Sequence, residues 1–205
     1  MRIVVPHGAE ADAVRGVIPH AAVVAPGAAS GASLPAFAAG ETALVLGLCG
    51  ALSQLSVGDV TIYARVRDTA RRFELDARLI EALQSALPSA SVVTACTTRR
   101  VVTRVEAREA LAQRFEAQVV DMEGTHLAAE LAARGVRCAM VRVVSDDASH
   151  NLPPIENAIG PDGRLRPLYL ALAFARAPRN AVRFVRDVRS ALTTLTETAR
   201  TVAAL

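Results

Sequence analysis

Lysine and tryptophan are absent from this chain of 205 residues, and all 23 basic residues are therefore arginine. The missing lysine excludes the P-loop proteins, which need a lysine beside the phosphates, and the enzymes that act through a lysine amine. Aromatic residues make up only 3% of the chain, which argues against a surface that stacks successive bases. The net charge of +3 comes without a recognised nucleic-acid-binding motif, so we expect no nucleic-acid partner.

Cysteines are few, and long apolar runs are missing. Cys49, Cys96 and Cys138 lie far apart and form no CxxC or Cys-His pair, so neither a zinc site nor a disulfide framework is expected. The apolar run before Pro6 is too short for a signal peptide. The longest apolar stretch, 43–52, is about half as long as a membrane span. We expect a cytoplasmic protein with no metal and no cofactor.

Short runs rich in valine and isoleucine recur along the chain, with helical patterns between several of them. These runs predict buried strands at 2–6, 21–25, 43–48, 60–66, 91–95, 118–120 and 137–145. Thr103 and Glu106 have the spacing of a capping box at the start of a helix, and Gly135 is placed to end a helix that begins near Met122. The alternation predicts an α/β fold, a three-layer αβα sandwich with a mixed central sheet, as a single domain over 1–205.

Two stretches near the C-terminus stand apart from this alternation. Residues 152–163 form a loop marked by proline and glycine, and a long helix is expected from about 167 to 204, with Pro178 as a point where it can break. One face of this helix carries Arg176, Arg179, Arg183, Arg186 and Arg189, opposite a largely apolar face. Such a helix either packs on the core with a solvated charged face or contacts an anionic membrane surface.

Carboxylates follow two successive predicted strands at the point where each strand ends. Asp121 and Glu123 stand at a strand-to-helix junction, and Asp146 follows the next strand. Ligands of open α/β sheets bind outside the carboxyl ends of the strands, so we expect Glu123 and Asp146 to face one crevice. A single acid at such a junction is more often a helix cap or a partner of the helix dipole than a catalyst, and we expect a mainly structural role for Asp121.

These segments resemble the nucleoside phosphorylase and nucleosidase superfamily (purine and other phosphorylases, family 1). The resemblance rests on V-D-M-E-G followed by R-V-V-S-D, on G-L-C-G-A-L at 47–52 with V-G-D-V at 57–60, and on the first strand with its turn at 8–11. Together they cover the chain to about residue 150 in the order of the family. The motif N-L-P-P at 151–154, the turn at 160–163 and the arginine-rich helix resemble the hopanoid-associated phosphorylases, which remove adenine from adenosylhopane.

The resemblance implies a role for each acid. Breaking a ribose–adenine bond builds positive charge on the sugar and negative charge on the base, so the site needs an acid for the base and an anion near the ribose. Asp146 would protonate adenine N7, and Glu10, with Asp12 as a nearby rival, would position or deprotonate the attacking water. The expected substrate-binding residues are Glu123 at the ribose hydroxyls, Met122 against the sugar, Ser145 beside Asp146, and Gly50.

The nucleophile can be water or phosphate. The phosphorylases of the superfamily usually carry an arginine and a serine where this chain has Val45 and Leu48, so two expected phosphate donors are missing. Water is therefore favoured, although phosphate stays open as a co-substrate because another arginine, such as Arg65, Arg99 or one of a neighbouring subunit, could bind it.

The sequence thus predicts an N-ribosyl hydrolase or nucleoside phosphorylase that releases adenine from a 5′-modified adenosine, with adenosylhopane foremost. The alternatives are a methylthioadenosine/adenosylhomocysteine nucleosidase, a purine nucleoside phosphorylase, and a non-catalytic nucleoside-binding protein. We expect a small-molecule nucleoside as ligand, a homodimer or higher homo-oligomer, and peripheral contact with an anionic membrane at the inner surface.

Overall fold

The computed structural model describes residues 1–158 and 166–205 of the chain. The strands are β1 (Arg2–Pro6), β2 (Ala22–Val24), β3 (Ala43–Ala51), β4 (Val60–Arg67), β5 (Arg72–Glu74), β6 (Ser91–Thr97), β7 (Val119–Asp121) and β8 (Cys138–Asp146). The helices are α1 (Ala9–Arg15), α2 (Ala77–Ala86), α3 (Val105–Phe115), α4 (Gly124–Ala133), α5 (Pro167–Arg176) and α6 (Pro178–Ala203), with short 3-10 turns η1 (Gly27–Ala29) and η2 (Gly31–Ser33). The turn expected at 160–163 lies outside the described residues.

The strands form one mixed eight-stranded sheet with the order β2-β1-β3-β7-β6-β4-β5, and β8 pairs with both β3 and β4. The β3–β8 pair is parallel, whereas the β4–β8 and β3–β7 pairs are antiparallel. Strands β3, β7, β6, β4 and β8 therefore close into a ring, with β1, β2 and β5 attached outside it. All nine residues of β8 are buried, which places this strand in the interior.

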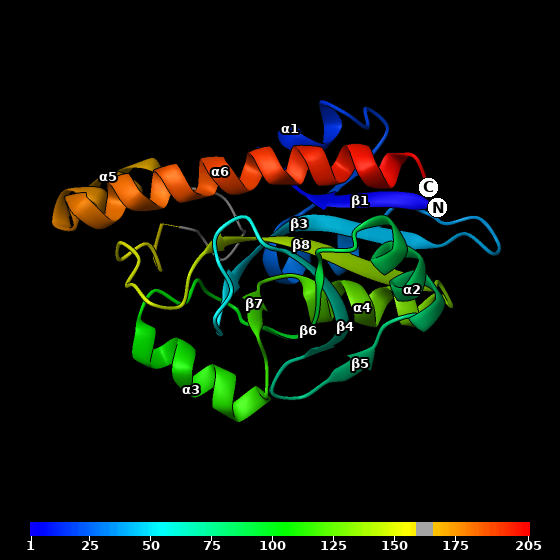
Figure 1. Ribbon diagram of the computed structural model, residues 1–205, viewed down its shortest axis with the longest axis horizontal. Coiled ribbons are helices and arrows are strands. Elements are labelled where there is room, and N and C mark those ends of the chain that lie inside the picture. Colours follow the sequence, from blue (N-terminus) through cyan, green and yellow to red (C-terminus); the bar gives the residue numbers. More distant parts are fainter. Residues whose placement is uncertain (159–165) are drawn as a thin grey trace.

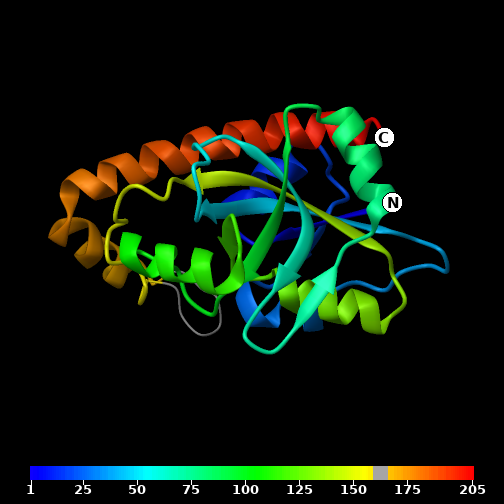
Figure 2. The same cartoon turned by 60° about the horizontal axis from the view of Figure 1, so that its bottom comes forward.

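Hydrophobic side chains leave the sheet on both faces, as alternation along each strand requires. On one face the aliphatic side chains of β1 and β3 pack against α1 and α6, with Val5, Leu46 and Leu195 in one cluster. On the other face, Val45 and Met140 pack with Leu127 of α4. Figures 1 and 2 show α6 along one side of the sheet and α4 on the opposite side. The predicted α/β fold with helices on both faces of a mixed sheet is confirmed.

Three local features differ from the sequence-based expectations. Strand β5 was not predicted because it is a short edge strand with only three residues, two of them exposed. The turn at 8–11 is part of a true helix, α1. The capping box is wrong: α3 begins at Val105, the Thr103 hydroxyl donates to the Glu156 carboxylate, and the Val105 amide donates to Asn151 Oδ1 at 2.8 Å. The loop after β8 thus supplies the cap. Gly135, with a φ of 66°, follows the end of α4.

The C-terminal region forms two helices that meet at Pro178, which occupies the first turn of α6. In Figure 1, α6 crosses the whole sheet and α5 folds back at its beginning. Arg183 does not belong to a free charged face, because it pairs with Asp147 at 2.7 Å and with Asp187 at 3.4 Å. Arg186 also pairs with Asp187, at 2.9 Å. Within the described ranges, we find no helix that is both long and apolar enough to cross a bilayer.

Candidate active site

Glu10 enters the site from the first turn of α1. Gly8, with a φ of 114°, allows the sharp turn from β1 into this helix, a backbone conformation that favours glycine. The Glu10 side chain is 23% exposed, and its Oε1 atom accepts a hydrogen bond from the Leu48 amide at 2.6 Å. Burial, together with the negative charge of Glu123, raises the pKa of Glu10 to about 7. Asp12, the rival base, is exposed on the same helix.

Arg142 lies in the middle of β8 and is completely buried. Its Nη1 atom is 3.7 Å from Glu10 Oε1, and its Nη2 atom is 3.8 Å from Asp121 Oδ2 and 4.0 Å from Glu123 Oε2. Among the described residues, none of its three guanidinium nitrogens has a hydrogen-bond partner. Although burial alone would lower the pKa of Arg142, the surrounding acids raise it above its usual range. One buried cation thus faces three carboxylates.

Glu123 and Met122 come from the junction between β7 and α4. Glu123 Oε1 accepts a hydrogen bond from the Gly27 amide at 2.8 Å, and the Met122 methyl group lies beside the same glycine. Burial raises the pKa of Glu123, against the opposing effect of Arg142. The segment after β2 and the segment after β7 therefore meet at this site, as the polar pairing requires.

Asp121 lies at the base of the same junction. Its side chain is fully buried, and Oδ1 accepts hydrogen bonds from the Thr97 hydroxyl at 2.7 Å and from the Gly124 amide at 3.2 Å. These bonds link the start of α4 to β6, while the residue at the N-cap position of α4 is Glu123.

Asp146 ends β8 and is held on both oxygens. The Ser145 hydroxyl lies 2.7 Å from Asp146 Oδ1 and 3.1 Å from the Cys49 carbonyl oxygen. The Arg108 guanidinium donates from Nη2 to Asp146 Oδ2 at 2.5 Å. Burial raises the pKa of Asp146, and the positive charge of Arg108 opposes this rise. The side chain is 12% exposed, so the acid is largely removed from water.

Two glycines of β3 leave room for these side chains. A Cβ atom at Gly47 would overlap the Arg142 guanidinium and would lie 2.6 Å from Glu10 Oε1. A Cβ atom at Gly50 would lie 2.8 Å from Asp146 Oδ2. The G-L-C-G segment thus gives space to the charged groups of the site.

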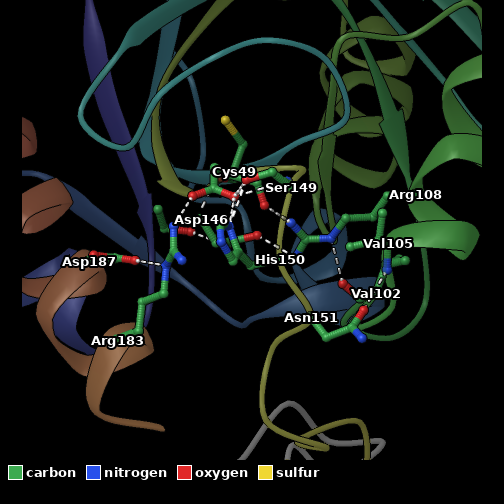
Figure 3. A network of polar contacts seen from close by, with 12 residues as sticks. Cys49, Val102, Val105, Arg108, Asp146, Ser149, His150, Asn151, Arg183 and Asp187 are labelled. Carbon is green, nitrogen blue, oxygen red and sulfur yellow. Dashed lines mark hydrogen bonds and ion pairs between the residues drawn. The ribbon is translucent and has the colours of Figure 1, made fainter. Parts of the chain in front are cut away.

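The loop after β8 joins the site to α3 and α6. Figure 3 shows Arg108 and Arg183 approaching this loop from opposite sides. Asp147 accepts from Arg183, and the His150 ring lies 3.1 Å from the same carboxylate. A small cavity of about 10 Å³, enough for roughly one water molecule, lies between Asp146 and the beginning of α6.

The structure places Glu10 and Glu123 around Arg142. Asp146 lies beside Gly50 and Ser145 and is paired with Arg108. Sequence reasoning missed both Arg142 and Arg108. Arg142 carried a signal, since it is a charged residue inside an apolar strand and belongs to the R-V-V-S-D motif. Arg108 carried none, because it stands among glutamates and alanines as an ordinary helix surface residue does. Of the arginines considered for phosphate, Arg65 is paired with Glu74 at 2.6 Å.

Comparisons with known proteins agree with this architecture. No curated protein matches the chain by sequence. A 5′-methylthioadenosine/S-adenosylhomocysteine nucleosidase from Neisseria meningitidis superposes with a TM-score of 0.73 at 17% identity, covering 99% of this chain and 98% of that one. The corresponding Campylobacter jejuni nucleosidase gives 0.69 at 14% identity with full coverage of both chains. Futalosine hydrolase of Helicobacter pylori gives 0.64 at 14% identity, covering 92% of this chain and 97% of that one.

The family model of the phosphorylase superfamily matches residues 13–158. The matched range includes both glycines of β3, the V-D-M-E-G motif and the R-V-V-S-D motif. The chain therefore belongs to the phosphorylase superfamily.

Proposed function

We propose that this protein hydrolyses the N-glycosidic bond of a purine nucleoside of the adenosine type. The observation that carries the proposal is the group of acids around Arg142, a fully buried cation that lies 3.7 Å from Glu10, 3.8 Å from Asp121 and 4.0 Å from Glu123. The side chains of Glu10 and Glu123 are 23% and 11% exposed, so their carboxylates can accept hydrogen bonds from a polar ligand with several hydroxyl groups, while the buried Arg142 behind them offsets part of their charge. The names of the structural neighbours, two nucleosidases and a hydrolase, support the same class of reaction.

In the proposed reaction the bond between C1′ and the base breaks, and its electron pair leaves with the base. Asp146 donates a proton to N7 of the base, and the raised pKa of this buried carboxyl favours the protonated form that the step needs. Water attacks C1′ and gives a proton to Glu10, whose pKa of about 7 suits a general base near neutral pH. Glu123 would accept hydrogen bonds from the ribose hydroxyls, with Met122 against the sugar.

Water fits this site better than phosphate as the attacking group. Val45, which stands where the phosphorylases usually carry an arginine, is buried in the hydrophobic core. The Leu48 amide, a further donor at this segment, is already bound to Glu10. An anion would also approach two carboxylates, which repel it, whereas a neutral water is not repelled.

The substrate that we propose is a 5′-modified adenosine, with adenosylhopane as the first choice because of the resemblance at 151–154 and of the C-terminal helices. Methylthioadenosine and adenosylhomocysteine are the second choice, supported by the names of the structural neighbours.

A panel of nucleosides tests this proposal: methylthioadenosine, adenosylhomocysteine, adenosine and adenosylhopane, with release of the free base as the readout. Asp146→Asn should lower release by orders of magnitude, to a small residual turnover, while ligand binding stays within about tenfold, because the acid acts in the transition state. Base release from none of the four, or full activity of Asp146→Asn, would contradict the proposal, and binding without cleavage would indicate a nucleoside-binding protein.

We also propose that the outer surface of α5 and the beginning of α6 contacts an anionic membrane. Leu168, Tyr169 and Leu172 of α5 are 84%, 52% and 48% exposed, and Val182 of α6 is 73% exposed. Residues 166–186 contain five arginines, of which Arg183 and Arg186 are paired with Asp147 or Asp187, so Arg166, Arg176 and Arg179 supply the positive charge of this surface. Exposed apolar side chains among cations are typical of surfaces that insert at the lipid interface, where each basic residue contributes on the order of 1 kcal/mol.

Vesicle sedimentation tests this contact. Leu168→Ser with Leu172→Ser, or Arg176→Gln with Arg179→Gln, should weaken binding to anionic vesicles at low salt, and the parent protein should dissociate as ionic strength rises. The matched control, Arg78→Gln with Arg200→Gln, removes two exposed arginines elsewhere and should bind as the parent does. A parent protein that ignores anionic vesicles would refute the contact. A self-association that the serine variants abolish would assign the surface to a second copy of the chain.

A further inference from the structure

Arg108 makes a set of contacts that the proposed reaction does not yet use. Its side chain is 2% exposed, although it belongs to α3, whose nearby residues Glu106 and Glu109 are both solvent-exposed. The guanidinium donates from Nη2 to Asp146 Oδ2 at 2.5 Å, from Nη1 to the Asp147 carbonyl at 2.5 Å, and from Nε to the Val102 carbonyl at 3.0 Å. Figure 3 shows the side chain extended from α3 toward the end of β8.

One of these three contacts is with an acid, Asp146. Two of the three acceptors of Arg108 are backbone carbonyls, so Asp146 is the only carboxylate that compensates its charge among the contacts described. Charge-assisted hydrogen bonds from a guanidinium are strong and directional, and they restrict the rotation of a carboxylate. Ser145 holds the other oxygen, so the carboxyl plane is fixed from two directions.

We propose that Arg108 is a positioning residue for the reaction, which holds the carboxyl group of Asp146 in the orientation needed to meet the base. The inference rests on the proposed function, because it assumes that Asp146 is the proton donor. Arg108 acts through Asp146 and also ties the segment before α3 to the loop after β8, so that the acid and the wall of the site move together.

The charge of Arg108 also affects when Asp146 is protonated. The charged and titratable groups near this acid are Arg108 of α3, Asp147 and His150 of the following loop, Arg183 and Asp187 of α6, and the Cys49 thiol of β3. Arg183 is already compensated by Asp147 and Asp187. Arg108 stabilises the carboxylate, so removing its charge raises the pKa of Asp146 further.

The test compares Arg108→Met and Arg108→Lys with the parent enzyme on a cleaved nucleoside. In Arg108→Met, we expect kcat to fall roughly 10- to 100-fold with KM nearly unchanged, because orientation acts mainly in the transition state. The loss of activity at high pH should move to higher pH, since the proton donor stays protonated longer. Arg108→Lys keeps the positive charge but reaches fewer acceptors. Its kcat should therefore fall, while the pH at which activity is lost on the alkaline side should stay unchanged. Arg104→Gln, an exposed arginine of the same segment, should change neither quantity.

A double-mutant cycle separates this role from a merely structural one. In the Asp146→Asn background, Arg108→Met should cause no further loss of the residual turnover, because the residue acts through the missing carboxyl group. Equal losses in both backgrounds, or Arg108→Met and Arg108→Lys variants with parental kcat and pH profile, would overturn the inference. If Asp146→Asn retains full activity, the proposed function itself fails. If Arg108→Met does not fold, the same double-mutant cycle can be measured with Arg108→Lys, and its outcomes are interpreted in the same way.

Discussion

At the scale of single residues, the site contains buried ionisable groups that lower the stability of the fold. Glu10 is kept from water beside Glu123, and burial raises its pKa to about 7. The folded state therefore binds a proton more tightly than the unfolded chain, so ionisation of Glu10 lowers the stability of the fold as the pH rises from the usual glutamate pKa of 4.5 toward 7. Above pH 7 the buried carboxylate is ionised and lowers the free energy of unfolding, a loss of stability that we attribute to its function.

Glu10→Gln should consequently stabilise the protein at pH 8 by roughly 1–3 kcal/mol while abolishing turnover, because glutamine keeps the shape without the charge. At pH 5 the two proteins should be nearly equal in stability, since folded Glu10 is then protonated. Chemical denaturation at both pH values measures this, with Asp12→Asn on the exposed side of α1 as the control. A Glu10→Gln variant that is destabilised at pH 8 would show that the carboxylate stabilises the fold.

At the scale of elements, the sequence predicted the strands well and the local connections less well. The valine-rich runs identified seven of the strands, because buried strands have a strong hydrophobic pattern. The capping box failed because α3 begins at Val105, and Asn151, which is distant in sequence, accepts the hydrogen bond from the Val105 amide. The motif residues Glu10, Glu123 and Asp146 could be selected in advance. Arg108 could not, since its burial depends on its contacts with Asp146 and Asp147, which are distant in sequence.

Strand β3 gives an element-scale prediction. Gly47→Ala should leave the fold intact but lower kcat/KM by roughly 100-fold or more, because the new methyl group displaces the Arg142 guanidinium and Glu10 by about an ångström. Thermal unfolding and steady-state kinetics measure both effects. Gly16→Ala, where the new atom meets its nearest neighbour at 3.4 Å, is the matched control. Parental turnover in Gly47→Ala would show that the close approach at β3 does not matter for the reaction.

At the scale of the whole molecule, the closed ring of strands brings separated segments to one place. The pairing of Gly50 with both Val120 and Asp146 sets the end of β7 beside the end of β8. The alternation of strands and helices predicted the layers. It could not predict the ring, because closure depends on which distant strands pair and in what register. The proposed cleavage by water depends on the whole arrangement, since α1, the junction between β7 and α4, and β8 each contribute one acid.

The most direct measurement identifies the sugar product by NMR. The enzyme is incubated with a 5′-modified adenosine in buffer with and without millimolar phosphate. Hydrolysis predicts that adenine is released at the same rate in both buffers and that the product is the free ribosyl sugar. Strict dependence on phosphate with a sugar 1-phosphate as product would contradict the account of Glu10 as the base that activates water.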